Sequence, residues 1–215
     1  MKTRTKGSLA ALAAASIMSW VTVVPAAGQE LPLPRLGETP SIAVSVEGAP
    51  SRGPVDAPIV VVEFCDLASE ACSAAAVVLD AVLEQYGDHV RHVFKHRPNP
   101  HMPDQHVAHE AIVAAGAQDG FWIMREMVLN NQHALVREGL LGMAAQAGLD
   151  AARLAADLDS GEHRPAIDRD VADAETLEIK IVPTFFVNGH RVTGVPTRTE
   201  WVAWLDELLG GPSDR

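Results

Sequence analysis

The chain has 215 residues, of which 47% are hydrophobic and 21% charged, and it carries a formal net charge of -11. This composition excludes a disordered or low-complexity chain and is typical of one globular domain with a single core. The acidic balance excludes the basic surface that binds nucleic acid. Two cysteines, Cys65 and Cys72, are too few for a small disulfide-stapled fold.

The first 28 residues have the pattern of a secretory signal peptide. Three basic residues at positions 2–6 precede a mostly apolar run from Leu9 to Val24, and small residues follow at 26–28. An uncleaved anchor is the alternative, but two serines and Pro25 interrupt a run that is short for a spanning helix of about 20 residues. We therefore expect cleavage after residue 28, or one or two residues earlier, a secreted and periplasmic protein, and no stable membrane span after cleavage. Loss of the three basic residues would take the net charge from -11 to -14.

Residues 29–53 are rich in proline, glycine and small residues, which predicts a linker. Within it, Ile42 to Val46 alternates and could form an edge strand. Ile59 to Phe64 is a continuous β-branched run and predicts a buried central strand. Ser69 to Gln85 follows as a helix, and Val90 to Lys95 predicts a second strand parallel to the first. The apolar stripe expected on the helix consists of Ala74, Val77, Val78, Ala81 and Val82.

From residue 104 to residue 177 the pattern is helical only. Breaks at Asp119-Gly120, Asn130-Asn131, 148–150 and Gly161 predict four or five short helices. Strands return at Thr184 to Val187 and 190–192, joined by Asn188-Gly189, a strong hairpin signal. A final amphipathic helix is expected over 198–209.

Several short motifs, in this order and spacing, resemble the DsbA family of thiol-disulfide oxidoreductases. The resemblance covers residues 54–210 and implies an α/β class, thioredoxin-like fold with an inserted all-helical subdomain at about 104–177. The motifs that carry it are Asp56-Ala57-Pro58, Val62-Glu63-Phe64-Cys65-Asp66, Gly120-Phe121-Trp122, Asp159-Ser160-Gly161 and Val182-Pro183-Thr184-Phe185-Phe186-Val187-Asn188-Gly189.

The resemblance also implies site residues. Pro183 matches a cis-proline opposite the active site, and Val182, Pro183 and Thr184 match an edge that binds an extended peptide. A trans proline that begins a strand is the alternative for Pro183.

The family's Cys-x-x-Cys motif falls on Ser69-Glu70-Ala71-Cys72, so a serine occupies the position of the attacking cysteine. Disulfide exchange proceeds through a sulfur-to-sulfur intermediate that a hydroxyl cannot form. Glu70 would further oppose a low thiol pKa at this position. Cys72 matches the shielded resolving cysteine, and Ser69 could simply cap the helix.

Two further residues near this motif leave alternatives open. Glu63 matches a buried acid that moves protons in active relatives; burial would raise its pKa, but without an attacking thiol it could be a structural relic. Cys65 and Cys72 could form a disulfide if their Cα atoms lie within about 7 Å. Otherwise they are two separate buried thiols that pack as small hydrophobes.

Histidines are concentrated in one part of the chain: His89, His92, His96, His101, His106 and His109. His106 and His109 are three residues apart on a predicted helix beside Glu110, so they could share a zinc ion. The spacing matches no established metal motif, so we expect solvated surface histidines, with no metal and no other cofactor.

The leading interpretation is a secreted DsbA-like protein that is impaired in dithiol exchange and retains the peptide-binding edge. Its expected partner is an extended peptide or a cysteine-containing secreted client. One alternative is a residual oxidoreductase or isomerase that uses Cys72 with Cys65. Another is an enzyme similar to kappa-type glutathione transferases, in which the Ser69 hydroxyl would stabilise a glutathione thiolate.

Overall fold

The computed structural model of the chain describes residues 36, 40–103 and 106–210, and the predicted signal peptide lies outside the described residues. The described part belongs to one compact unit, and none of its helices is long and apolar enough to cross a bilayer. Its elements are β1 (Ser51–Arg52), β2 (Ile59–Cys65), α1 (Glu70–Tyr86), β3 (Val90–His96), α2 (His106–Gly116), α3 (Phe121–Asn130), the 3-10 helix η3 (Gln132–Ala134), α4 (Arg137–Gln146), α5 (Ala151–Ser160), α6 (Arg164–Thr176), β4 (Thr184–Val187), β5 (His190–Thr193) and α7 (Arg198–Leu208).

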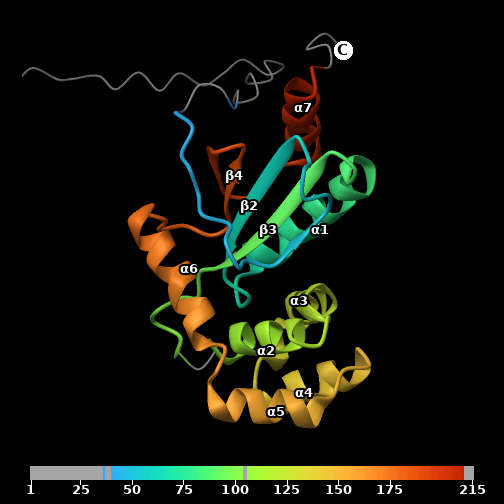
Figure 1. The fold of residues 1–215 in the computed structure, drawn as a ribbon, viewed down its shortest axis with the longest axis vertical. Helices are drawn as coiled ribbons and strands as arrows, with labels where there is room; N and C mark the ends of the chain where they lie inside the picture. The colour runs from blue at the N-terminus through green and yellow to red at the C-terminus, as the bar shows by residue number, and fades with distance from the viewer. Residues whose placement is uncertain (1–35, 37–39, 104–105, 211–215) are drawn as a thin grey trace, which may run out of the picture. The chain divides into compact units, whose positions relative to one another are not determined.

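The strands form a five-stranded sheet in the order β1-β3-β2-β4-β5 (Figure 1). β2 and β3 are parallel, as the sequence predicts, and the other three pairs are antiparallel. β2 is therefore central, and both of its faces are buried: Ile59 and Val61 lie in one core cluster and Val62 and Phe64 in another. This explains why its apolar run does not alternate.

α1 and α7 pack on one face of the sheet, where Trp201 and Trp204 join the core. On α1 the buried residues are Cys72, Ala75, Ala76, Leu79, Val82 and Tyr86. The stripe predicted for this helix is partly wrong: Val82 is buried and Val78 packs against the core, but Ala74, Val77 and Ala81 are exposed. Alanine and valine residues of this helix occur on most of its sides, so the periodicity of the sequence does not identify the side that faces the sheet.

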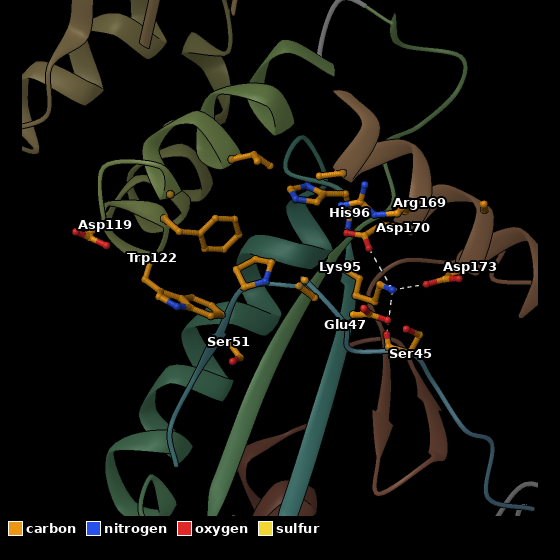
Figure 2. Close-up of a pocket in the computed structure, with 18 residues that line it drawn as sticks. Ser45, Glu47, Ser51, Lys95, His96, Asp119, Trp122, Arg169, Asp170 and Asp173 are labelled. Carbon is orange, nitrogen blue, oxygen red and sulfur yellow. Dashed lines mark hydrogen bonds and ion pairs between the residues drawn. The ribbon is translucent and has the colours of Figure 1, made fainter. Parts of the chain in front are cut away.

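α6 and the segment 40–50 cover the opposite face. Ile42, Val44 and Val46 pack on it in alternation, but this segment has no strand; the edge strand is β1, five residues further on. Lys95 reaches from β3 beneath this segment and contacts Ser45, Asp170 and Asp173 (Figure 2). The buried ammonium ties the segment and α6 to the sheet.

α2 to α5 form a helical layer that lies beyond the carboxyl end of β2 (Figure 1). The breaks between its helices fall where the sequence predicts: Asp150 caps the start of α5, and Gly161 ends it with a φ of 65°. The core of this layer includes Cys65, Leu67 and Cys72 from the turn between β2 and α1. The turn that carries the predicted site is therefore packed between the sheet and the helical layer.

Candidate functional site

Ser69 is the N-cap residue of α1. Its side-chain oxygen accepts a hydrogen bond from the main-chain N–H of Cys72 at 3.4 Å. The side-chain amide of Gln132 donates to the carbonyl oxygens of Leu67 and Ser69, at 2.8 and 2.9 Å, and fixes the turn. The hydroxyl is thus part of the helix cap, a role that serine fills well.

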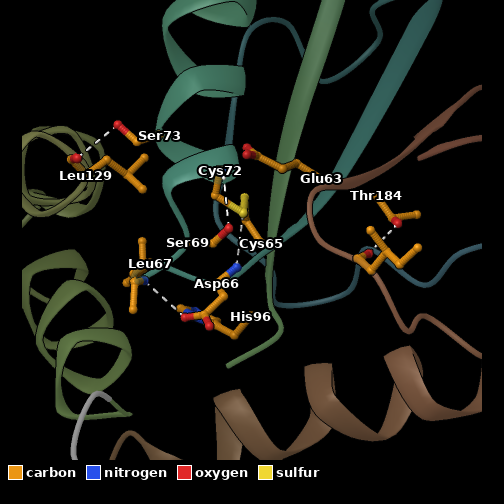
Figure 3. The surroundings of a disulfide bond; sticks show 12 residues. Glu63, Cys65, Asp66, Leu67, Ser69, Cys72, Ser73, His96, Leu129 and Thr184 are labelled. Atoms are coloured by element: carbon orange, nitrogen blue, oxygen red, sulfur yellow. Dashed lines mark hydrogen bonds between the residues drawn. A yellow bond between two sulfur atoms is a disulfide. The ribbon is translucent and has the colours of Figure 1, made fainter. Parts of the chain in front are cut away.

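Cys65 and Cys72 are joined in a disulfide, with Cα atoms 5.9 Å apart (Figure 3). The alternative of two separate thiols is wrong for this structure. Both cysteines are 0% exposed, and the main-chain N–H of Asp66 donates to the Cys72 sulfur at 3.3 Å. Neither sulfur can meet another protein's thiol without opening the turn.

Glu63 is an ion-paired carboxylate. Its Oε2 atom accepts hydrogen bonds from Arg125 Nη2 and His92 Nε2, both at 2.8 Å. Burial alone would raise the Glu63 pKa, but the charge of Arg125 and the His92 hydrogen bond outweigh it, and the pKa is lowered. The expected upward shift is therefore wrong, and Glu63 holds a charge instead of a proton.

The other side of His92 completes this buried network. Arg52 Nε donates to His92 Nδ1 at 3.1 Å, which leaves the ring proton on Nε2 facing Glu63. Burial lowers the His92 pKa more than Glu63 raises it. A neutral imidazole thus bridges two charged groups.

A second buried polar chain starts at Asp66. Its carboxylate accepts from the main-chain N–H groups of Ala68 and Asn99, both at 3.1 Å, and lies 3.3 Å from His109 Nε2. Burial raises its pKa, but these contacts prevail and the pKa is lowered. The Nδ1 atoms of His109 and His96 are hydrogen-bonded at 2.9 Å. This series of hydrogen-bonded side chains runs from the disulfide turn to the end of β3.

The edge predicted to bind peptide lies beside the disulfide. The Val182–Pro183 peptide bond is cis, and Val182 packs against the cluster that contains Cys65 and Cys72. Thr184 pairs with Phe64 in the sheet and donates its hydroxyl to the carbonyl of Ile181 at 2.7 Å. The structure therefore brings together Ser69, the cysteine pair and this edge.

Three of the six clustered histidines are buried. His92, His96 and His109 are 0–1% exposed, so the prediction of solvated histidines is wrong for these three. His106 Nε2 contacts the Asn99 carbonyl at 2.9 Å, and so does not share a metal with His109. Within the described residues, one group has ligand atoms close enough for a metal, namely Asp157, Glu162 and His163. It lies in α5 and the turn that follows, and nothing else there indicates a ligand.

Sequence reasoning missed Arg125, His92, Asp66 and Gln132. The available signal was Arg125, a lone cation in the otherwise mostly apolar Phe121–Asn130 helix, which contains a single acid, Glu126. A cation in such a segment usually has a buried partner.

The buried histidines make stability depend on pH. Burial is the largest effect on His92, His96 and His109 and lowers the pKa of each. The ordinary pKa of histidine is 6.5, so below this pH the histidines of the unfolded chain bind protons while the buried histidines of the folded chain stay neutral. The folded state therefore has its full stability above pH 6.5 and loses stability as the pH falls. We expect the free energy of unfolding in urea to fall as the pH decreases from 6.5 to 5, by at most about 1.4 kcal/mol per pH unit for each of them.

The matched variants are His96→Gln, which should reduce this slope, and His101→Gln at an exposed position, which should not. A free energy of unfolding that stays level from pH 7 to pH 5 would contradict the assignment.

The fold and the site define a thioredoxin-like protein with an inserted helical layer. Residues 45–207 match the family described as Thioredoxin. The chain belongs to this thioredoxin family, and the predicted fold class is confirmed.

Solved structures share the fold at low sequence identity. Oxidised BdbD from Bacillus subtilis superimposes with a TM-score of 0.71 at 21% identity, over 80% of this chain and 98% of BdbD. Alpha-DsbA1 from Wolbachia pipientis gives a TM-score of 0.69 at 18% identity, over 78% and 94% of the two chains. The fold is thus that of DsbA-like thiol-disulfide oxidoreductases.

Curated relatives are longer proteins. The chain is 37% identical over 195 residues to the Na(+)/H(+) antiporter NhaA of Herminiimonas arsenicoxydans, covering 88% of this chain and 30% of that protein. It is 36% identical over 144 residues to NhaA 1 of Salinispora arenicola, covering 66% and 22%. The chain spans less than a third of either relative, so the similarity concerns a portion of each.

Proposed function

We propose that this protein is exported to the periplasm, binds extended segments of secreted client proteins, and does not carry out dithiol exchange. The observation that carries the proposal is the pairing of Cys72 with buried Cys65 while Ser69 caps the helix. No free thiol is left at the helix N-terminus, where a thiolate would have to attack.

The edge at Val182 supports the binding role. Within the described residues, the main-chain groups of Val182 have no hydrogen-bond partner, and neighbouring Ile181 is 61% exposed. An extended peptide could satisfy these groups as an added strand does. The Glu63 ion pair supports the loss of exchange chemistry, because a carboxylate held by Arg125 is a poor proton carrier.

The test uses reduced, carboxymethylated α-lactalbumin, an unfolded polypeptide without free thiols. We expect the exported full chain to bind it with a Kd on the order of 10 μM. Ile181→Asp should weaken binding at least about tenfold, because it places a charge beside the edge. The control is Val55→Asp in the turn before β2, where the valine is 80% exposed.

Three results would oppose the proposal. If Ile181→Asp and Val55→Asp weakened binding equally, the edge would not be part of the binding surface. Oxidation of a fluorescent dithiol peptide by the unmodified chain would show that it does carry out dithiol exchange. Saturable glutathione binding that is lost in Ser69→Ala would favour the transferase-like alternative.

A further inference from the structure

A second candidate site lies apart from the disulfide and the cis-proline edge. A cavity of about 1010 Å³ opens between the segment 45–51, the end of β3, α2, α3 and α6 (Figure 2). One wall is apolar and includes Val113, Phe121 and Trp122. A cavity of this size with an aromatic wall can hold an organic molecule.

His96 places a buried imidazole on this cavity. The side chain is 1% exposed, and the centres of the His96 and Phe121 rings are 6.3 Å apart. Nδ1 is hydrogen-bonded to His109 on α2, whereas Nε2 has no hydrogen-bond partner within the described residues. A buried polar atom without a partner costs free energy, and a ligand that supplies the partner recovers it.

The carboxylate of Asp66 determines which His96 nitrogen holds a proton. Its Oδ1 atom can only accept and lies 3.3 Å from His109 Nε2, so the His109 proton is on Nε2. The main-chain N–H of Leu67 also lies 3.3 Å from this nitrogen, but a hydrogen bond to an ionised carboxylate is about twice as strong as one between neutral groups. His109 Nδ1 is then an acceptor and takes the His96 Nδ1 proton. His96 Nε2 therefore has a lone pair and needs a donor.

The charges on the cavity lining favour a cation, because carboxylates outnumber basic groups. The carboxylates belong to Glu47, Asp119, Asp170 and Asp173, and the basic groups to Lys95 and Arg169. Lys95 is already bound by Asp170 and Asp173. Even so, burial keeps the Asp170 pKa raised, so the negative charge of this carboxyl is not fully compensated. Glu47 and Asp119 are exposed and have no ion pair in the described part of the chain.

A primary ammonium meets both requirements, since it has three N–H donors, no acceptor and a positive charge. Burial holds the His96 pKa well below its usual range, so the proton stays on the amine and is not taken by the imidazole. The ring of Trp122 already carries the Arg52 guanidinium at 4.5 Å. The aromatic wall therefore suits the uncharged body of the ligand, and the ammonium belongs at His96.

We propose that this cavity binds an organic amine as its ammonium ion, with an N–H donated to His96 Nε2 and the apolar body against Phe121 and Trp122. Arg169 opposes a cation, but it is exposed and hence screened by water. Its removal provides a test with a definite sign.

The probes are tryptamine, N,N,N-trimethyltryptamine, 3-methylindole and indole-3-acetate, which share an indole ring. Binding to the exported full chain is followed by NMR of isotope-labelled histidine and tryptophan side chains. We expect an unprotonated His96 Nε2 in the free protein. Tryptamine should bind with a Kd of about 1 mM or below and shift the His96 and Trp122 signals. The other probes should bind at least about fivefold more weakly, because each lacks the ammonium N–H, the positive charge or both.

Charge variants separate this site from nonspecific attraction to an acidic protein. Glu47→Gln/Asp119→Asn should weaken tryptamine binding about threefold or more. Asp88→Asn/Glu207→Gln is the matched control, since it removes two exposed acids that do not line the cavity, and it should leave the affinity unchanged. Arg169→Gln should tighten binding about twofold.

His96 variants test the hydrogen bond. His96→Leu should abolish tryptamine binding, whereas His96→Gln, whose side-chain carbonyl can accept, should preserve part of it. If His96→Leu fails to fold, the comparison of tryptamine with its trimethyl derivative and the charge variants decide.

Any of four results would overturn the inference. These are a proton on His96 Nε2 in the free protein, binding of trimethyltryptamine or indole-3-acetate as tight as that of tryptamine, equal effects of the two double acid variants, and no shift of the His96 or Trp122 signals at about 10 mM tryptamine.

Discussion

Arg125→Met should lower the free energy of unfolding by about 3–5 kcal/mol, because it leaves the ionised Glu63 buried without its cation. Arg125 and Glu63 are 1% and 0% exposed, so water cannot replace the lost partner without opening the core. The guanidinium also lies over the rings of Phe94 and Trp122, at 5.2 and 5.7 Å. Urea unfolding at pH 7.5 measures the loss.

Glu63→Gln/Arg125→Met is the matched double variant. A neutral amide oxygen can still accept the His92 hydrogen bond, so the double variant should regain at least about half of the lost stability. Arg198→Met, at an exposed position of α7, controls for loss of a surface charge. The ion-pair account fails if Arg125→Met alone costs less than about 1 kcal/mol, or if the second substitution gives no recovery.

Ser69→Cys alone should restore little dithiol oxidase activity. The new thiol would lie beside a Cys72 sulfur that is already bonded to Cys65 and buried. Exposed Glu70 in the first helical turn would also oppose the thiolate. Oxidation of a fluorescent dithiol peptide is the measurement, with the unmodified chain as baseline.

Ser69→Cys/Cys65→Ser should be at least about tenfold more active than Ser69→Cys, because it frees Cys72 to pair with position 69. The single variant Cys65→Ser is the control and should remain inactive, since it holds one thiol. Robust activity of Ser69→Cys without the second change would show that Cys65 does not restrain the site.

Much of the scaffold could be predicted because the local signals agree with the fold. The run at Ile59, the Asn188-Gly189 hairpin and the breaks at Asn130 and Gly161 lie within a residue or two of the observed boundaries. The buried side of α1 could not be predicted, because alanine and valine residues occur on most sides of that helix.

Only those site residues that lie in a recognisable sequence motif could be predicted. The resemblance identified Ser69 and Pro183, whereas the Arg125 and Glu63 pair joins residues 62 positions apart through packing of α3 on the sheet. The bond between Cys65 and Cys72 depends on how the turn folds back on α1. A separation of seven residues is equally compatible with two distant thiols.

The central claim is that a buried disulfide and a capping serine leave the protein without a sulfur able to attack a client. Native protein isolated from its own compartment can be treated with iodoacetamide in mild dithiothreitol, before and after unfolding, and weighed by mass spectrometry. The account predicts no alkylation while the protein is folded, two alkylated cysteines after unfolding with reductant, and no protein bound through sulfur. Alkylation of folded protein, or a client covalently linked to Cys72 or Cys65, would contradict it.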